Sequence, residues 1–300
     1  MAAIAANGIT IEYTDEGAGD PLVLIMGLGG QLVDWPQGLV DELVARNFRV
    51  IRFDNRDAGL STEFTAAPPT LAQIAKAVVF RGSLDAEYRL TDMAADTVGL
   101  LDALGIEAAH VTGMSMGGMI AQTAAIEHPL RVRSLTSIMS NTGDRRNGNP
   151  SPSLVRKTVR RPMATRETAL ELGVELFREI CGPTFDEAEF RVLMQASIDR
   201  SFRPAGTARQ SAAILAGPNR TEALTALDLP TLVIHGLVDP LVRPSGGIAT
   251  ASAVPGSRLL MFNDMGHDLP DTRFVEIADA IRRNADRASA PAVAARQLSG

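Results

Sequence analysis

The sequence contains a single cysteine, Cys181, among its 300 residues, and it has no excess of basic charge. One cysteine can form neither an internal disulfide nor a cysteine-based metal site. The composition therefore gives no indication of an oxidising compartment. The formal net charge is -6 at pH 7. Nucleic acids and anionic membrane surfaces require a basic surface on their partner, so we expect no nucleic-acid partner.

Long apolar segments are also lacking. The longest apolar run lies around residues 21–30, well short of the ~18 residues that a membrane helix needs. The first ten residues have no basic segment followed by an apolar stretch, so they do not resemble a secretory signal. We find no internal repeat and no low-complexity tract in the body of the chain. From these absences we expect no integral membrane segment and a cytoplasmic protein.

Short apolar segments bounded by turn residues are what the chain does have. Residues 22–26 form a continuous apolar run followed by Gly27, a pattern typical of a strand buried on both faces. Six further segments favour strands, namely residues 9–13, 48–53, 109–113, 132–139, 231–236 and 258–262. Helical periodicity lies between several of these strands, in residues 39–46, 91–104 and 272–286 and in the segment before His128. Such alternation favours a mostly parallel sheet with helices on both faces.

The alternation stops between residues 141 and 228. Amphipathic helices take its place, one over residues 166–181 and one that begins at a capping box formed by Thr184 and Glu187. Ligand sites in parallel sheets lie at the carboxyl ends of the strands, where such an insertion would form a lid. We therefore predict a core domain of residues 1–140 and 229–288 and a helical cap of residues 141–228. An aperiodic tail, residues 289–300, is expected to be mobile.

Residues 113–117, Gly-Met-Ser-Met-Gly, fit the pattern G-x-S-x-G between an expected strand and an expected helix. In that setting a sharp turn strains the serine backbone and exposes its hydroxyl group. The glycines leave room for neighbouring backbone, and the helix N-terminus offers unpaired N–H groups. Ser115 is therefore the candidate nucleophile. The alternative is a glycine-rich turn in which the serine is incidental.

A serine nucleophile needs a base, and the chain has four histidines. His267 follows the last expected strand, at the sheet edge where Ser115 also emerges, and is the candidate base. A structural role is expected for His110, which lies in the strand before the serine. His128 ends a helix and is expected to be a surface or cap residue, and His235 is expected to shape its loop.

The third member of a triad orients the imidazole and stabilises its cation. Asp239 follows the strand at residues 231–234, and the chain order Ser, Asp, His is that of α/β-hydrolases. An aspartate in a turn before proline is the alternative interpretation. Asp144 is the second candidate for the acid. Asp264 and Asp268 flank His267 so closely that we expect them to point elsewhere.

An acyl-transfer intermediate also needs N–H donors for its oxyanion. The backbone of Met116, at the start of the helix after the serine, is one candidate donor. The loop Gly27-Leu28-Gly29-Gly30 supplies the other, for which we choose the N–H of Leu28. The alternative is that this loop is only a flexible turn.

Together these segments resemble the α/β-hydrolase superfamily over residues 7–286. Residues 24–30 resemble its oxyanion loop, with Met26 where many members have histidine. Residues 53–62 resemble its D-x-R-G-x-G-x-S segment, with Asp57 in place of the first glycine. Residues 113–118, 235–240 and 266–267 resemble its elbow, its acid loop and its histidine loop.

The Met-Gly loop and the Arg56-Asp57 segment are especially similar to aclacinomycin methylesterase-like esterases, which hydrolyse methyl or other small esters under a helical cap. The resemblance implies an α/β-hydrolase fold: a mostly parallel eight-stranded sheet, helices on both faces and a helical cap inserted after strand 6. Arg56 and Asp57 are expected to brace the loop beside the elbow. An aspartate at the elbow would indicate dehalogenation or epoxide opening, whereas Ser115 indicates acyl transfer.

We therefore predict a serine hydrolase of the carboxylesterase type, with Ser115, His267 and Asp239 as its triad and a fairly apolar small-molecule ester as its substrate. The same triad serves hydrolases of C–C bonds, thioesters or lactones and perhydrolases. A ligand receptor or scaffold on the same fold is the non-enzymatic alternative. No cofactor is expected, and no spacing indicates a metal site. A homodimer is left open.

Overall fold

The computed structural model describes residues 1–70, 73, 84–162 and 164–289. Residues 290–300, which make up nearly all of the tail expected to be mobile, lie outside them. One sheet of eight strands runs through the molecule in the order β1-β2-β4-β3-β5-β6-β7-β8. The six strands from β4 to β8 in this order pair in parallel, and β1 and β2 are antiparallel at one edge. This sheet confirms the predicted fold class.

Each strand expected from the sequence is present, and one more precedes them. The strands are β1 (Ala2–Ala6), β2 (Ile9–Glu16), β3 (Asp20–Ile25), β4 (Phe48–Phe53), β5 (Ala109–Met114), β6 (Val132–Ile138), β7 (Thr231–Gly236) and β8 (Arg258–Phe262). The alanine-rich β1 was not predicted, because alanine has a low preference for strands. Its pairing with β2, which joins Ala2 to Tyr13 and Ala6 to Ile9, holds it in place.

The helices are α1 (Gln37–Ala45), α3 (Leu90–Ala103), α4 (Met116–Glu127), α5 (Pro152–Arg160), α6 (Ala169–Ile180), α7 (Glu187–Arg200), α8 (Pro204–Ala216), α9 (Thr221–Leu224), α10 (Ser245–Ala253) and α11 (Phe274–Ser289), with short 3-10 turns at Leu32–Asp34 and Asp271–Arg273. Six of these helices, α1, α3, α4, α6, α7 and α11, lie close to the positions expected from the sequence. The segment expected to be helical also contains α5, α8 and α9, for which no bounds were predicted, and α10 was not predicted.

The start of α7 differs from the expectation. We predicted a capping box that begins at Thr184, whereas the side chain of Asp186 caps this helix by accepting the N–H groups of Ala188 and Glu189 at 2.9 and 3.0 Å. A carboxylate satisfies two free N–H groups at a helix N-terminus and also suits the helix dipole. The predicted capping box at Thr184 was therefore wrong, and the helix begins two residues later, after Asp186.

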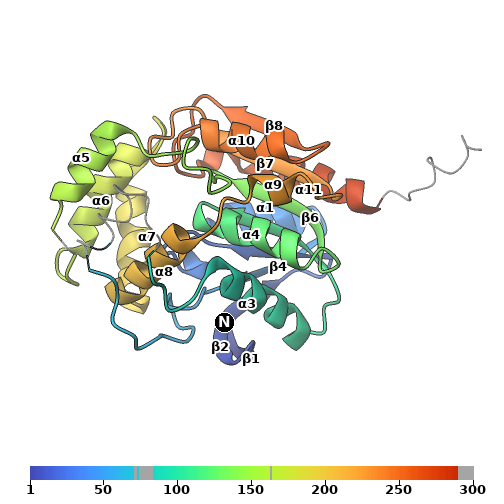
Figure 1. Ribbon diagram of the computed structural model, residues 1–300, viewed down its shortest axis with the longest axis horizontal. Coiled ribbons are helices and arrows are strands. Elements are labelled where there is room, and N and C mark those ends of the chain that lie inside the picture. The colour runs from blue at the N-terminus through green and yellow to red at the C-terminus, as the bar shows by residue number, and fades with distance from the viewer. Residues whose placement is uncertain (71–72, 74–83, 163, 290–300) are drawn as a thin grey trace, which may run out of the picture.

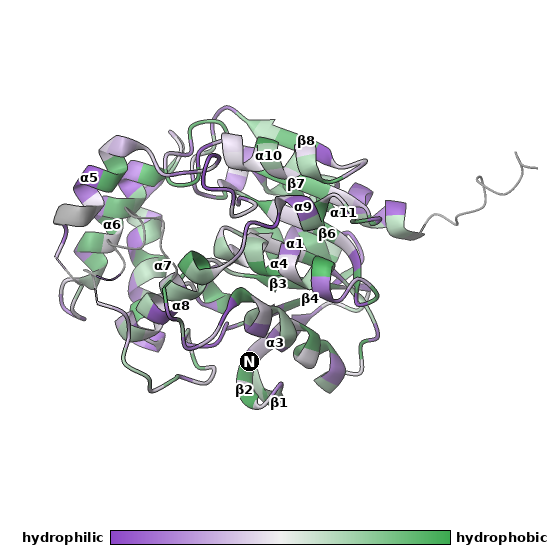
Figure 2. Ribbon diagram, viewed as in Figure 1, coloured by the Kyte–Doolittle hydropathy of each residue, from purple (hydrophilic) through white to green (hydrophobic). Residues whose placement is uncertain are grey.

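Two apolar layers cover the sheet, one on each face. On β3, Leu22 and Leu24 face a layer that includes α1 and α11, whereas Val23 and Ile25 face a layer that includes α3 and α4. Side chains alternate between the two faces of a strand, so a strand covered on both faces is apolar throughout. Nearly all of α4 is buried, from Met116 to Ala125, and Figure 2 colours this helix mainly as hydrophobic or neutral.

The chain between β6 and β7 contains α5 to α9 and no strand among its described residues. Figure 1 shows α5 to α8 grouped at one end of the molecule, beside the sheet. In Figure 2 hydrophilic and hydrophobic colours alternate along α5, α6 and α7, as in helices with one buried side. We refer to residues 141–228 as the cap segment.

The parallel strands bring the candidate residues to one edge of the sheet. β5 leads into Ser115, β7 leads toward Asp239, β8 leads toward His267 and β3 leads into the loop that contains Leu28. The strand order reverses around β3, which pairs with both β4 and β5. Ligands bind at such a reversal, outside the carboxyl ends of the strands.

Candidate active site

Ser115 occupies a strained turn between β5 and α4. Its φ and ψ are 56° and -119°, and its N–H donates to the carbonyl of Ile138 at 2.8 Å. A positive φ is uncommon for a residue other than glycine, and such strain persists only where the surrounding structure holds it. The turn therefore has the geometry expected of a nucleophile elbow.

The two glycines of the pattern are required by close backbone contacts. A Cβ on Gly113 would lie 2.0 Å from the carbonyl oxygen of Gly117, and a Cβ on Gly117 would lie 2.0 Å from that of Ile25. Both distances are far below van der Waals contact, so only glycine fits at either position. The pattern G-x-S-x-G thus reflects how tightly α4 packs on β5 and β3.

The loop after β3 lies against the serine side chain. A Cβ on Gly27 would lie 3.2 Å from Ser115 Cβ and 3.7 Å from its Oγ. The N–H of Leu28 has no acceptor among the described residues. Met116 is the first residue of α4, where an N–H has no partner within the helix. Both N–H groups expected to bind an oxyanion are therefore available.

Asp239 and His267 form a buried pair. His267 Nδ1 lies 2.7 Å from Asp239 Oδ2, and the other carboxylate oxygen accepts the N–H groups of Leu241 and Val242 at 2.8 and 2.9 Å. The two residues are 2% and 5% exposed. An Nδ1–H that donates to a carboxylate leaves Nε2 with a lone pair, the form that a general base needs.

The other three candidate acids lie elsewhere. Asp144 accepts hydrogen bonds from the side chain of Asn147 and from a backbone N–H in its own loop. Asp264 forms an ion pair with Arg273 at 2.8 Å. Asp268 accepts backbone N–H groups. The structure thus places Asp239, and none of these three, against His267.

The end of α6 holds the loop that carries His267. The N–H of His267 donates to the carbonyl of Ile180 at 2.7 Å, and Asp268 Oδ1 accepts the N–H groups of Gly182 and Gly266 at 3.0 and 2.8 Å. Burial raises the pKa of Asp268 above its ordinary value. The sequence contained no signal for this contact, because it joins the cap segment to a loop 86 residues away.

Side chains from two regions hold the oxyanion loop. Asn55, directly after β4, donates its amide N–H to the carbonyl of Met26 at 3.0 Å. Gln210 on α8 accepts the N–H of Gly29 at 2.8 Å. Gln31 donates to the carbonyl of Ser197 on α7 at 2.6 Å. Two helices of the cap segment therefore contact this loop directly.

Arg56 and Asp57 each form a buried ion pair with a helix. Arg56 binds Asp96 on α3 through bonds of 2.6 and 2.7 Å, and Asp57 accepts two bonds of 2.8 Å from Arg209 on α8. Burial tends to raise the pKa of Asp57, but bonds from Arg209, a backbone N–H and Tyr88 outweigh it and lower that pKa. Both residues are structural braces in this geometry.

The remaining histidines make structural contacts. His235 is fully buried and its Nε2 lies 2.7 Å from the carbonyl oxygen of Val242, next to the acid loop; burial lowers the pKa of its imidazole. His110 lies 2.8 Å from the hydroxyl of Ser134, and burial lowers its pKa to about 4. His128 follows α4 as its C-terminal cap.

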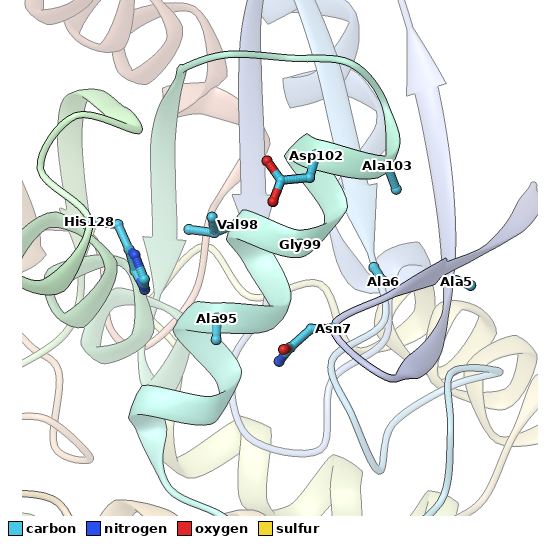
Figure 3. A pocket seen from close by; sticks show the side chains of 9 residues that line it. All are labelled: Ala5, Ala6, Asn7, Ala95, Val98, Gly99, Asp102, Ala103 and His128. Atoms are coloured by element: carbon cyan, nitrogen blue, oxygen red, sulfur yellow. The ribbon is translucent and has the colours of Figure 1, made fainter.

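A surface groove of about 540 Å³ lies between α3 and the end of β1. Figure 3 shows Ala95, Gly99 and Asp102 of α3 on one side of this groove, Asn7 on another, and His128 near the end of α4. α4 has 12 residues, so its two ends are about 18 Å apart at 1.5 Å per residue. Since Ser115 precedes α4, the groove is separate from the candidate active site.

The described residues contain no group of three or more His, Cys, Asp or Glu side chains arranged to hold a metal ion. None of the helices described combines the length with the apolar composition that crossing a membrane requires.

Comparison with known proteins places this geometry in a family. The sequence profile of the alpha/beta hydrolase fold matches residues 20–274. The chain belongs to the α/β-hydrolase family. Rhodomycin D methylesterase DnrP from Streptomyces peucetius is 30% identical over 295 residues, which cover 89% of this chain and 92% of that protein. 2-Hydroxymuconate semialdehyde hydrolase from Pseudomonas sp. strain CF600 is 29% identical over 276 residues, which cover 88% of this chain and 86% of that protein.

Solved structures share the fold of this α/β-hydrolase over nearly its whole length. The enol-lactonase from Burkholderia xenovorans superposes with a TM-score of 0.70 at 23% identity and covers 97% of this chain and 100% of its own. A thermophilic esterase from Thermogutta terrifontis gives a TM-score of 0.69 at 23% identity, with 96% and 99% covered.

Proposed function

We propose that the protein hydrolyses a carboxylic ester through an acyl-enzyme formed on Ser115. The observation that carries the proposal is the buried pair of Asp239 and His267 at the sheet edge where the strained Ser115 turn lies. Membership of the α/β-hydrolase family and the likeness to a methylesterase support an ester-hydrolysing enzyme. The assignment of the individual residues is our inference from their geometry.

The chemistry follows from these positions. His267 Nε2 takes the proton of the Ser115 hydroxyl, and the serine oxygen attacks the ester carbonyl carbon. The N–H groups of Leu28 and Met116 bind the resulting oxyanion. The His267 cation then gives its proton to the departing alcohol, and the C–O bond breaks. A water molecule deprotonated by His267 attacks the acyl-enzyme and releases the acid, which restores Ser115.

The side chains beside the candidate site support a fairly apolar substrate. Leu28 on the oxyanion loop is 42% exposed, and Leu237 and Val238, directly before Asp239, are 48% and 49% exposed. Exposed apolar side chains that flank polar catalytic groups are typical of small-molecule sites. Because the relative DnrP is a methylesterase, methyl esters of bulky apolar acids are the substrate class that we propose.

We infer that the cap segment is the lid of this site and that the core consists of residues 1–140 and 229–288. The contacts that support this inference are those of α6 with the His267 loop and of α7 and α8 with the oxyanion loop. A segment with these contacts lies next to the space where an ester would bind.

The test compares the wild-type protein with Ser115→Ala on p-nitrophenyl esters of graded chain length and on methyl esters of bulky acids. We expect hydrolysis by the wild type, a loss of at least about 10⁴-fold in Ser115→Ala, and covalent labelling of Ser115 by a fluorophosphonate. Ser153→Ala, at an exposed serine on α5, is the matched control and should keep full activity.

Other outcomes would change the assignment. Labelling that misses Ser115, or unchanged hydrolysis by Ser115→Ala, would contradict the proposed nucleophile. Ser115-dependent cleavage of a lactone, a thioester or a C–C bond without cleavage of any ester would reassign the bond. Ligand binding without turnover of any of these substrates would support the receptor alternative.

A further inference from the structure

Gln210 connects the cap segment to the loop that carries the Leu28 N–H. Its Oε1 accepts the N–H of Gly29 at 2.8 Å, and its Nε2 donates to the carbonyl of Arg56 at 2.8 Å. The side chain is fully buried. It therefore joins two backbone segments, the loop after β3 and the loop after β4, from a third element, α8.

The two hydrogen bonds allow only one orientation of the Gln210 amide. If the amide were turned over, its NH₂ group would face the N–H of Gly29 and its oxygen would face the carbonyl of Arg56. Both contacts would then be repulsive, and a buried polar group without a partner costs about 1–3 kcal/mol. The oxygen of Gln210 is thus held toward Gly29.

The partners of Gln210 are themselves fixed. Arg56 is bound to Asp96 on α3 by two bonds, and Arg209, the residue before Gln210, is bound to Asp57 by two bonds. The charged side chains around Gln210 are therefore already paired. The Gln210 amide is therefore anchored at the Arg56 carbonyl, and its oxygen holds the Gly29 N–H of the oxyanion loop.

Gly29, the residue after Leu28, is held by α8. Gly29 has a φ of +69°, and a Cβ on it would lie 2.8 Å from the hydroxyl of Thr207, also on α8. With Thr207 packed against it on one side and Gln210 bound to its N–H, the backbone of Gly29 has little freedom. α8 therefore holds the Leu28–Gly29 peptide, the one that follows Leu28. The Gly27–Leu28 peptide, which carries the Leu28 N–H, is held at its carbonyl by the N–H of Gly30 at 3.1 Å, so the peptides on both sides of Leu28 are fixed.

From this geometry we infer that Gln210 is a positioning residue of the cap segment that holds the Leu28 N–H in the direction needed to bind the oxyanion. The inference rests on the proposed function, since the Leu28 N–H binds an oxyanion only if Ser115 acylates. Gln210 itself does not touch the substrate. Its effect should therefore appear in the rate of acyl transfer rather than in substrate binding.

The first test replaces Gln210 with methionine, which has a similar length but forms neither hydrogen bond. Removing an oxyanion donor lowers kcat by about 10²–10³-fold, and misdirecting one should lose part of that. We expect Gln210→Met to lower kcat on a p-nitrophenyl ester by about ten- to a hundredfold with KM changed by less than about threefold. Ser211→Ala, which removes a bond within α8 to the Thr207 carbonyl, is the matched control and should keep the wild-type kcat.

The second test uses Gln210→Glu, which has almost the same shape. A protonated glutamic acid can donate to the Arg56 carbonyl and accept from the Gly29 N–H, as the amide does, whereas a carboxylate repels that carbonyl. The ratio of its kcat to that of the wild type should therefore rise as the pH is lowered from 8 to 5.5. The ratio cancels the titration of groups that both proteins share.

Thermal unfolding of each variant, followed by circular dichroism, gives the folded fraction at the assay temperature, and kcat is calculated per folded molecule. A folded Gln210→Met with kcat within twofold of the wild type would overturn the inference. If Gln210→Met does not fold, a kcat ratio for Gln210→Glu that is constant with pH would overturn it. Failure of the proposed function is seen separately, as hydrolysis by the wild type that persists in Ser115→Ala.

Discussion

Asp239 shows how a single side chain determines the chemical form of its neighbour. One of its oxygens accepts the N–H groups of Leu241 and Val242, and the other faces Nδ1 of His267. The first two bonds fix the carboxylate, so its second oxygen can only accept from the ring. The imidazole is therefore held in the tautomer with its proton on Nδ1 and the basic lone pair on Nε2.

This arrangement predicts the effect of Asp239→Asn. The two backbone N–H groups would keep the amide oxygen, so the NH₂ group would face Nδ1 of His267 and favour the opposite tautomer. We expect kcat to fall by about 10³–10⁴-fold with little loss of stability. Steady-state kinetics and thermal unfolding of the variant measure both effects. Asp144→Asn, at the second candidate for the acid, serves as the control, and an equal loss in that variant would contradict the assignment.

Asp57 is a second residue whose role depends on its conformation. It has a φ of 68°, at the position where the resembled family segment has glycine. Aspartate tolerates this left-handed region better than most residues do. Glycine would occupy it with less strain, but only the carboxylate can bind Arg209. Asp57, which stands where the family segment has glycine, is thus paired with Arg209 on α8.

At the scale of elements, the cap segment is bonded to the core at several separate points. The end of α6 binds the His267 loop, α7 binds Gln31, and α8 binds Gly29 and Asp57. The contacts of α6 and those with Gln31 and Gly29 lie at or next to loops that carry a candidate catalytic group, and Asp57 lies in the loop after β4 that braces them. The same helices that would cover the substrate therefore also hold the loops in position.

A double-mutant cycle on Asp57 and Arg209 measures the strength of one such contact. Removing one partner of a buried ion pair leaves an unpaired charge and costs about 3–5 kcal/mol. We expect Asp57→Asn and Arg209→Met each to destabilise strongly in urea unfolding, and the double variant to lose clearly less than the sum of the two. Additive losses would show that the pair is not coupled. Arg178→Met, in an exposed pair with Glu187, should change stability by less than about 1 kcal/mol.

Most elements of the fold were predictable, and the reasons are local. β4, β7 and β8 were predicted with their observed bounds, because each is an apolar run that ends at a turn. The helix expected over residues 91–104 is α3, and it ends before Gly105, whose φ of 66° is the left-handed conformation in which glycine commonly ends a helix. The alanine-rich β1 was missed because its pairing partner, rather than its own composition, makes it a strand.

At the scale of the whole molecule, burial changes how stability depends on pH. His110 lies between the sheet and its covering layer, with its ring centroid 5.9 Å from that of Phe48, and burial lowers its pKa from an ordinary value of 6.5 to about 4. The unfolded chain binds a proton at this site below pH 6.5, whereas the folded protein does not until about pH 4. The contribution of His110 to the free energy of unfolding is therefore fully present above pH 6.5 and is lost as the pH falls toward 4.

The size of this effect can be measured with His110→Asn, which cannot ionise. Between pH 7 and pH 5 the wild type should lose about 2 kcal/mol more unfolding free energy than the variant. Urea unfolding at several pH values checks this difference. His235 also has a lowered pKa, but it is present in both proteins and cancels. Equal pH dependence of the two proteins would show that His110 does not contribute.

Some statements about the whole molecule remain predictions from the sequence. The cytoplasmic location, the mobile tail and a homodimer are among them. The domain boundaries are likewise predictions, although the described residues place α5 to α9 between β6 and β7.

The sequence by itself determined the fold class and the list of candidates. Apolar runs, turn residues and the pattern around Ser115 are local features. Each is formed by residues close together in the sequence, so it can be recognised without knowing the tertiary structure. The choice among four aspartates as the partner of His267, the contact of Gln210 with the oxyanion loop and the contact of Arg209 with Asp57 were decided only by the tertiary structure. The contacts of Gln210 and Arg209 join residues far apart in the chain, and packing of the cap segment against the loops after β3 and β4 brings them within hydrogen-bonding distance. Asp239 meets His267 because β7 and β8, which precede them, are neighbours in the sheet.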